Sequence, residues 1–203
     1  MRYKYLITTL ILSTLFAQNE ISLERVLDGT FRTESIGSYD WKNSSDSFYF
    51  SEQGDEGLDF YEYDIVSDDT LKAFSVKKSV ISDFSYTFSP DQKKLLLKKN
   101  SVKLWRHSSY GSYYVYDITS ESITTVSSNP DSLRNVKFSP DSNKLAFVRN
   151  DNNLYLFDLT NEIEEQLTFD GSEDILNGHF GWVYEEEFGT YDSYKWSPNS
   201  CLL

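Results

Sequence analysis

The chain has 203 residues, a formal net charge of -13 and one cysteine, so no disulfide can form within it. This length suits one ordinary domain or a piece of a larger protein. The acidic balance argues against nucleic-acid binding, because no basic stripe is present to neutralise phosphates. Aromatic residues make up 16% of the chain, with 15 Tyr and 14 Phe, and this content favours strands over helices.

Residues 1–17 have the pattern of a secretory signal peptide. Arg2 and Lys4 precede an apolar run, and Ala17 stands where the residue before cleavage is expected. The run is shorter than the roughly 20 residues of a membrane span. We therefore predict an exported protein, periplasmic, at the cell surface or secreted, with an uncleaved amino-terminal anchor as the alternative. An exported chain without disulfides fits a bacterial periplasm or surface better than a disulfide-rich extracellular module.

Residues 18–36 form a separate amino-terminal segment before the main body of the chain. Ile21, Leu23, Val26 and Leu27 have the spacing of one short amphipathic turn or helix.

From residue 37 the chain repeats one pattern of turns and strands. Each copy has an aromatic residue, a Ser-Pro turn in which proline presets the bend, and an apolar strand. The copies begin at Phe88, Phe138 and Trp196, with a degenerate copy at Trp41. A second strand follows in three copies and ends in an aromatic-Asp-aliphatic triplet, at 63–65, 116–118 and 157–159. Short strands at 71–76, 123–126 and 164–167 come next.

A repeat of roughly 45–55 residues made of strands and turns is typical of a β-propeller, whereas a β-sandwich does not repeat in this way. We predict blades at about 37–78, 79–128 and 129–170, an insertion at 171–192, and a further blade from about 193. Since closed propellers need about four to eight blades, we expect an all-β, partial propeller of four-stranded antiparallel sheets over 37–203. We interpret it as truncated, about three and a half blades long.

The insertion contains the first stretch with functional chemistry. Residues 182–188 read Trp-Val-Tyr-Glu-Glu-Glu-Phe, so aromatic residues bracket three consecutive carboxylates, Glu185, Glu186 and Glu187. Crowded carboxylates raise one another's pKa, and a bound cation relieves their repulsion. Two adjacent carboxylates converge on one cation more easily from a helical turn than from a strand. The alternative is a solvated acidic loop.

Residues 102–108, Val-Lys-Leu-Trp-Arg-His-Ser, are the second such stretch. Arg106 and His107 beside Trp105 are consistent with a plain surface pair or with a cation–π contact. For His107 we predict a structural hydrogen bond and no catalytic role.

The two stretches resemble the glutamate motif and the Trp-Arg-His-Ser motif of the dipeptidyl peptidase IV family, serine exopeptidases of the prolyl oligopeptidase clan. The resemblance implies that a short helix projects from the propeller into the active-site cavity. It also implies that Glu186 and Glu187 bind the free α-amine of a peptide substrate, and that Arg106 binds a backbone carbonyl near the amino end.

By the same resemblance, Glu185, Trp182 and Tyr184 support the site. One departure is Gly181, since the family often has Asp before the tryptophan. We therefore expect the capping of the helix to differ.

The resemblance further implies an exopeptidase that releases Xaa-Pro or Xaa-Ala dipeptides, with its own α/β-hydrolase domain as partner and a homodimer as one option for assembly. We assign no catalytic residue, because the chain has no Gly-x-Ser-x-Gly, and no metal site or cofactor. The propeller would bind the amine and gate access. One alternative is a non-catalytic homologue that binds peptides or proteins. Another is a clan peptidase for longer or blocked peptides, against which the acidic pair argues.

Overall fold

The computed structural model describes residues 21–33, 37–129 and 131–203, so the predicted signal peptide lies outside the described residues. The chain divides into two units, Met1–Gly37 and Ser38–Leu203. The first contains the expected short helix, α2 (Leu23–Leu27), which Ser22 caps by accepting a hydrogen bond from the Arg25 N–H at 3.3 Å. None of the residues of α2 is buried. Within the described ranges, no helix has the length and apolar character needed to cross a membrane.

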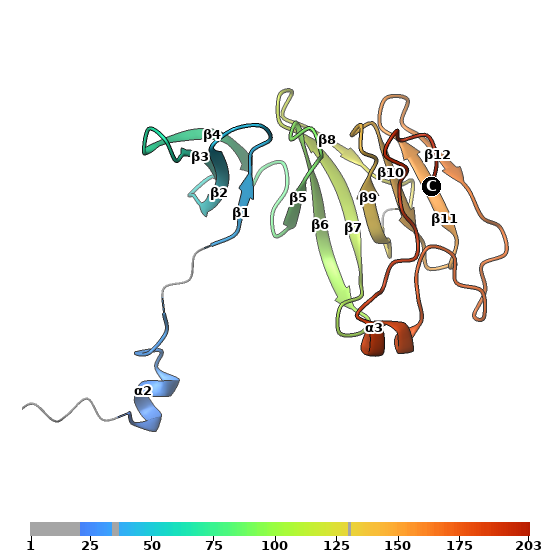
Figure 1. Ribbon diagram of the computed structural model, residues 1–203, viewed down its shortest axis with the longest axis horizontal. Helices are drawn as coiled ribbons and strands as arrows, with labels where there is room; N and C mark the ends of the chain where they lie inside the picture. Colours follow the sequence, from blue (N-terminus) through green and yellow to red (C-terminus); the bar gives the residue numbers. More distant parts are fainter. Residues whose placement is uncertain (1–20, 34–36, 130) are drawn as a thin grey trace, which may run out of the picture. The chain divides into compact units, whose positions relative to one another are not determined.

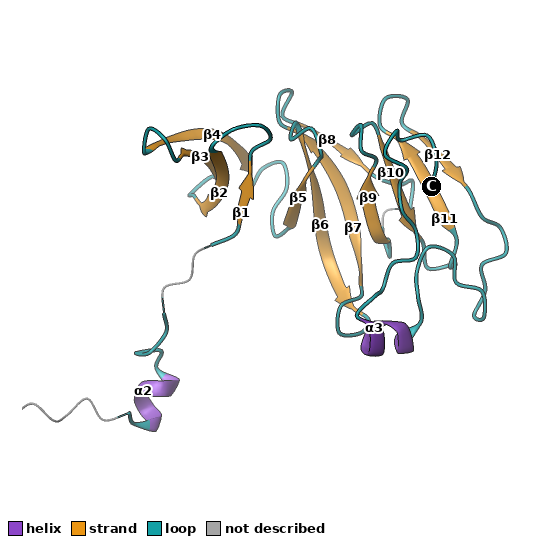
Figure 2. Cartoon of the chain, in the orientation of Figure 1, coloured by secondary structure: helices purple, strands orange, loops and turns teal. Residues whose placement is uncertain are grey.

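The second unit consists of three four-stranded antiparallel sheets with neighbouring strands in sequence order (Figures 1 and 2). The first sheet comprises β1 (Tyr39–Trp41), β2 (Ser47–Gln53), β3 (Gly57–Asp64) and β4 (Asp69–Lys77). The second comprises β5 (Ser85–Phe88), β6 (Lys94–Lys103), β7 (Ser109–Asp117) and β8 (Ser122–Thr125). The third comprises β9 (Arg134–Phe138), β10 (Lys144–Val148), β11 (Leu154–Asp158) and β12 (Ile163–Gln166). The predicted partial propeller is confirmed, and each sheet lies within one predicted blade.

Hydrophobic side chains on both faces of the second sheet join the three sheets into one stack. On β6, Leu95 and Leu97 pack in a cluster with Phe60 of the first sheet. Leu96, between them, packs in a cluster with Phe147 of the third sheet. Successive strand residues point to opposite faces, so a run of three leucines supplies both interfaces. A strand buried on both faces therefore reads as a continuous apolar run.

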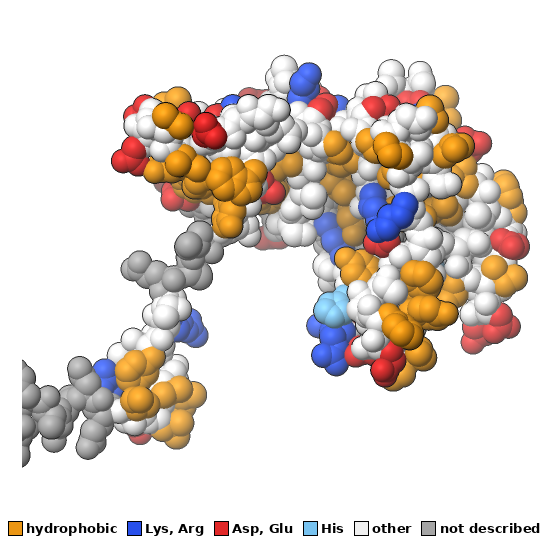
Figure 3. Space-filling model, in the orientation of Figure 1, with side chains coloured by type: hydrophobic (Ala, Val, Ile, Leu, Met, Phe, Trp, Pro, Cys, Tyr) orange, Lys and Arg blue, Asp and Glu red, His pale blue; other side chains and the backbone are white. Residues whose placement is uncertain are grey.

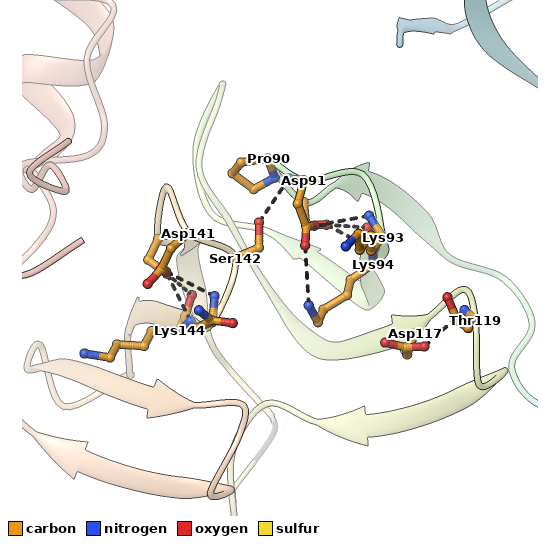
Figure 4. A network of polar contacts seen from close by, with 12 residues as sticks. Pro90, Asp91, Lys93, Lys94, Asp117, Thr119, Asp141, Ser142 and Lys144 are labelled. Atoms are coloured by element: carbon orange, nitrogen blue, oxygen red, sulfur yellow. Dashed lines mark hydrogen bonds and ion pairs between the residues drawn. The ribbon is translucent and has the colours of Figure 1, made fainter. Parts of the chain in front are cut away.

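The Ser-Pro turns link one blade to the next. Within the turn between β5 and β6 of the second sheet, the Ser89 hydroxyl donates to Asp91 Oδ1 at 2.6 Å. The Asp91 N–H donates to the Ser142 hydroxyl of the following turn at 3.1 Å (Figure 4). The Asp141 N–H repeats this bond to Ser200 at 2.9 Å. The repeated turn therefore fixes the spacing between blades as well as the bend between strands.

Residues 193–203 contain the predicted turn without the predicted strand. The Ser197 hydroxyl donates to Asn199 Oδ1 at 2.8 Å, and the Ser197 N–H donates to Leu202 O at 2.9 Å, as in the earlier turns. A strand is defined by successive ladder hydrogen bonds to a neighbour. Because this turn contributes one such bond, no strand is formed here.

Phe60 tests the packing between the first and second sheets. It is fully buried, and its ring centroid lies 4.4 Å from that of Phe74 and 4.9 Å from that of Tyr86. We expect Phe60→Ala to lower the free energy of unfolding by about 3–5 kcal/mol, because the change leaves a cavity. Phe169, which is 78% exposed, provides the control. Urea denaturation showing equal losses for Phe60→Ala and Phe169→Ala would contradict this packing.

Candidate functional site

The insertion after the third sheet carries a short helix on a loop whose two ends meet. The helix is α3 (Trp182–Phe188), as the glutamate stretch predicts, and it lies at the end of the β6–β7 hairpin (Figure 1). An isolated antiparallel bridge pairs His179 with Asp192. Gly181 caps α3 without a side-chain hydrogen bond, and Gly189 ends it in the left-handed region at φ 63°. Glycine adopts this conformation without strain.

Contacts with the third sheet fix the base of this loop. The Asn135 side-chain amide on β9 donates to Gly178 O at 3.1 Å and to Tyr191 O at 3.2 Å, and so holds both ends. The hydroxyl of buried Tyr194 donates to Ala146 O of β10 at 2.8 Å. The helix therefore projects from a base attached to the third blade.

A buried carboxylate attaches α3 itself to the second blade. Glu185 is 2% exposed and accepts hydrogen bonds from the Ser108 N–H at 3.0 Å, from the Ser108 hydroxyl and from the His107 N–H. Both donor residues belong to the connection between β6 and β7. The tip of the insertion is thus held by a blade other than the one that holds its base.

The pKa of Glu185 corrects one expectation from the sequence. Crowding among the three glutamates was expected to raise the pKa values, and burial does act in that direction. The hydrogen bonds from Ser108 and from the His107 N–H outweigh burial, so the pKa of Glu185 lies below its ordinary value. Glu185 is therefore an ionised structural anchor at neutral pH.

The second glutamate meets the arginine of the other motif. Arg106 Nε lies 2.9 Å from Glu186 Oε2. The Arg106 side chain is 68% exposed, whereas that of Glu186 is 18% exposed. Glu187 follows on the same helix and is exposed. Residues 80 positions apart in the sequence thus come together on one surface, where basic, acidic and hydrophobic side chains adjoin one another around α3 (Figure 3).

The aromatic residues of the motif do not bury the carboxylates. Trp182 and Tyr184 are 55% and 50% exposed. Tyr184 stacks on Phe180 with ring centroids 4.8 Å apart, and it also contacts Phe188 at 5.7 Å. The buried glutamate is instead covered by the 107–108 backbone. The aromatic side chains form an exposed strip beside the acidic residues.

A buried histidine that sequence reasoning left without a role lies at the base of the loop. His179 is 4% exposed, and its Nδ1–H donates to Phe180 O at 3.1 Å. Its Nε2 then accepts from the guanidinium of buried Arg134. Burial, followed by the charge of Arg134, lowers the pKa of His179 to about 4. No motif surrounds His179 in the sequence, so nothing there pointed to this contact.

The fold and this surface define a class of protein: a β-propeller with a non-repeating helix whose glutamates meet an arginine from the neighbouring blade. The family model for the dipeptidyl peptidase IV (DPP IV) N-terminal region matches residues 89–203. The chain therefore belongs to the dipeptidyl peptidase IV family, and the resemblance found in the sequence is confirmed.

Individual relatives agree with this assignment. Dipeptidyl aminopeptidase B of Saccharomyces cerevisiae is 42% identical over 121 residues, covering 59% of this chain and 14% of the relative. Dipeptidyl peptidase 4 of Bos taurus is 38% identical over 58% of this chain and 16% of the relative. Prolyl endopeptidase FAP of Homo sapiens is 31% identical over 90% of this chain and 24% of the relative.

The fold matches as well. The crystal structure of Porphyromonas gingivalis dipeptidyl peptidase 4 superposes with a TM-score of 0.74 and 26% identity, covering 90% of this chain and 27% of that chain. The present chain thus spans about a quarter or less of the length of these proteins.

We expect Glu185→Ala to lower the free energy of unfolding by about 1–3 kcal/mol, because the change leaves the buried donors of Ser108 and the part-buried N–H of His107 unpaired. Amide hydrogen exchange in α3 should accelerate at the same time, since the tip loses its anchor. Glu187→Ala is the matched control, because Glu187 is exposed on the same helix. Equal stability of the two variants in urea would refute the anchoring role.

His179 predicts a dependence of stability on pH. Its pKa is about 4 in the folded chain and 6.5 ordinarily, so between these values the unfolded chain binds a proton that the folded chain does not. Stability should therefore fall as the pH drops from about 6.5 to about 4, and this contribution should not change further below that. His179→Gln should flatten this slope in urea titrations, whereas His107→Gln, which changes the other histidine, should preserve it. A slope unaffected by His179→Gln would exclude the effect.

Proposed function

We propose that this chain is the substrate-binding propeller portion of an exported serine exopeptidase that releases dipeptides from free amino termini. The observation that carries the proposal is the meeting of Arg106 with Glu186 at 2.9 Å on a helix anchored by buried Glu185. The family relationship supports a dipeptidyl peptidase, since the relatives that match the chain include a dipeptidyl aminopeptidase B and a dipeptidyl peptidase 4.

In this proposal, Glu186 and Glu187 bind the α-ammonium of the substrate. An ammonium group has three N–H donors, which two carboxylates satisfy better than one. They lie on neighbouring positions of α3, as expected for side chains that converge on one cation. Glu185 would not contact the amine, because its oxygens already accept from residues 107 and 108. Glu185 instead holds Glu186 and Glu187 in position.

Arg106 supplies the second contact of the proposed mechanism. With 68% of its side chain exposed, it has donors free to bind a backbone carbonyl of the substrate while Nε stays with Glu186. An amine held by the glutamates and a carbonyl held by Arg106 would set the scissile bond two residues from the amino terminus. A blocked terminus would leave the carboxylates without a cation, which gives specificity by exclusion.

Bond cleavage would require an α/β-hydrolase domain of the whole protein, since these 203 residues contain no Gly-x-Ser-x-Gly. The propeller would bind the peptide and restrict access to that domain. We also propose export directed by residues 1–17, which amino-terminal sequencing of the mature protein would test. A mature protein that begins at Met1 would retain the segment as an anchor.

The competing function is a peptide-binding propeller without catalysis. A further option within the family is cleavage inside a chain, since one relative is named prolyl endopeptidase. Dependence on a free α-amine would argue against cleavage inside a chain. It would not exclude the non-catalytic propeller, because such a homologue would also bind the α-amine. Hydrolysis of a dipeptide-releasing substrate by the whole protein would exclude the non-catalytic propeller. Cleavage that does not require a free α-amine would indicate cleavage inside a chain.

We expect Glu186→Gln and Glu187→Gln each to weaken binding of the free-amine peptide Ala-Pro-Gly at least tenfold, because each removes a charge-assisted contact. Isothermal titration calorimetry measures this directly. Glu165→Gln, on the exposed side of β12, is the matched control and should leave affinity unchanged. If N-acetylated Ala-Pro-Gly binds the unmodified chain as tightly as the free peptide, amine recognition is wrong.

A further inference from the structure

A cavity of about 250 Å³ lies between the second and third sheets beside the candidate site. Its wall includes Lys98 of β6, Tyr113 of β7 and Lys137 of β9, together with Tyr191 and Asp192 from the segment after α3. A water molecule occupies about 30 Å³ in the liquid, so the cavity has room for a small polar group together with several waters.

The positive charges of the cavity wall exceed the negative ones. Asp192 is the carboxylate there, and it already contacts Lys137 at 2.9 Å and Lys195 at 3.4 Å. Lys98 contacts the Ser109 hydroxyl, and its ammonium lies 5.6 Å from the centroid of the Tyr113 ring. Among the residues that the structure describes, no carboxylate contacts Lys98.

Within the described part of the chain, the Lys98 ammonium therefore lacks a carboxylate counter-ion. The chain carries a net charge of -13, so carboxylates are abundant elsewhere on it. Lys98 is half-buried, and burial lowers its pKa. Removing a charge from water without pairing it is unfavourable, and an anion in the cavity would relieve this cost. The cavity thus has the chemistry of an anion-binding site.

A glycine on the neighbouring strand leaves room for the Lys98 side chain. Gly111 is buried on β7, and a Cβ atom there would lie 2.7 Å from Lys98 Cε. The Gly111 backbone meanwhile pairs with Leu133, with N–O distances of 2.9 Å and 3.0 Å. The same residue therefore joins the second sheet to the segment leading into the third and leaves room for Lys98.

The cavity borders the segment that anchors the proposed amine-binding helix. His107 and Ser108 contribute to its wall. They directly follow Arg106, and Ser108 also anchors Glu185. Neighbouring Cα atoms are about 3.8 Å apart, and the carboxylate of a glutamate side chain lies roughly 5 Å from its own α-amine. Because the 107–108 segment both lines the cavity and anchors α3, the side chain of the first residue of a bound peptide is the part that would extend toward the cavity.

We propose that this cavity is a subsite for the side-chain carboxylate of an acidic first residue in substrate peptides, with Lys98 as its counter-ion. The inference rests on the proposed amine-binding function and adds a substrate class to it. Peptides that begin with Glu would be preferred over their Gln counterparts, which have the same shape without the charge.

The test compares two free-amine peptides, Glu-Pro-Gly and Gln-Pro-Gly, by isothermal titration calorimetry on the chain. We expect the Glu peptide to bind about tenfold more tightly, because its carboxylate makes a charge-assisted contact. Lys98→Met should abolish the preference. Lys99→Met is the matched control, since it removes the same charge from the adjacent strand position, which faces the opposite side. It should keep the preference.

Gly111→Ala provides a second variant that retains the ammonium group. The added methyl should displace the Lys98 side chain, so the preference should fall while affinity for Gln-Pro-Gly stays unchanged. Equal affinities of the two peptides for the unmodified chain would overturn the proposal. So would a preference that survives Lys98→Met.

A third probe separates this proposal from the proposed function. If neither peptide binds, amine recognition fails, and titration with glutarate then examines the cavity alone. Glutarate binding that Lys98→Met abolishes would mean a site for free carboxylates, which overturns its role as a substrate subsite. If both peptides bind equally and glutarate does not bind, the amine site stands and the cavity proposal falls.

Discussion

The site around α3 depends on the buried carboxylate of Glu185. A helix of seven residues has little stability of its own, because few of its hydrogen bonds close within it. The three hydrogen bonds that Glu185 accepts from His107 and Ser108 replace this missing stability with a tertiary contact. They also fix Arg106, one residue before His107, relative to Glu186, one residue after Glu185. A single ionised group thereby sets the distance between the two charges that the proposed function uses.

The propeller supplies the rigidity that this arrangement needs. The base of the insertion is attached to the third sheet through Asn135, and its tip to the second sheet through Glu185. The relative position of those two sheets is fixed by their shared core and by the bond from the Asp91 N–H to the Ser142 hydroxyl. Any change in the angle between these blades would strain the insertion, because its base and its tip are attached to different blades. Packing between the sheets and geometry of the site are thus linked.

Charge is distributed unevenly around this linked structure. The acidic side of the site lies on α3, whereas the ammonium groups of Lys98 and Lys137 line the neighbouring cavity. A peptide has its cationic amine at one end and variable side chains beside it, so adjacent regions of opposite sign suit its first residue. The buried His179 and Arg134 at the base of the loop form a separate polar contact. Because the pKa of His179 is about 4, its imidazole stays neutral over most of the physiological pH range.

The sequence by itself determined the repeat, the strands and the helical glutamate motif. Alternating aromatic and aliphatic residues, Ser-Pro turns and the run Leu95 to Leu97 are local patterns, and local hydrogen bonding and strand alternation act on them directly. The tertiary structure decided which glutamate is buried. Glu185, Glu186 and Glu187 are chemically identical in sequence, and they differ because the 107–108 backbone covers one of them. Tertiary structure likewise decided the contact of Arg106 with Glu186, the pairing of His179 with Arg134 and the position of Lys98 in the cavity wall. Each of these features brings together residues from different segments, and no local pattern specifies such distances.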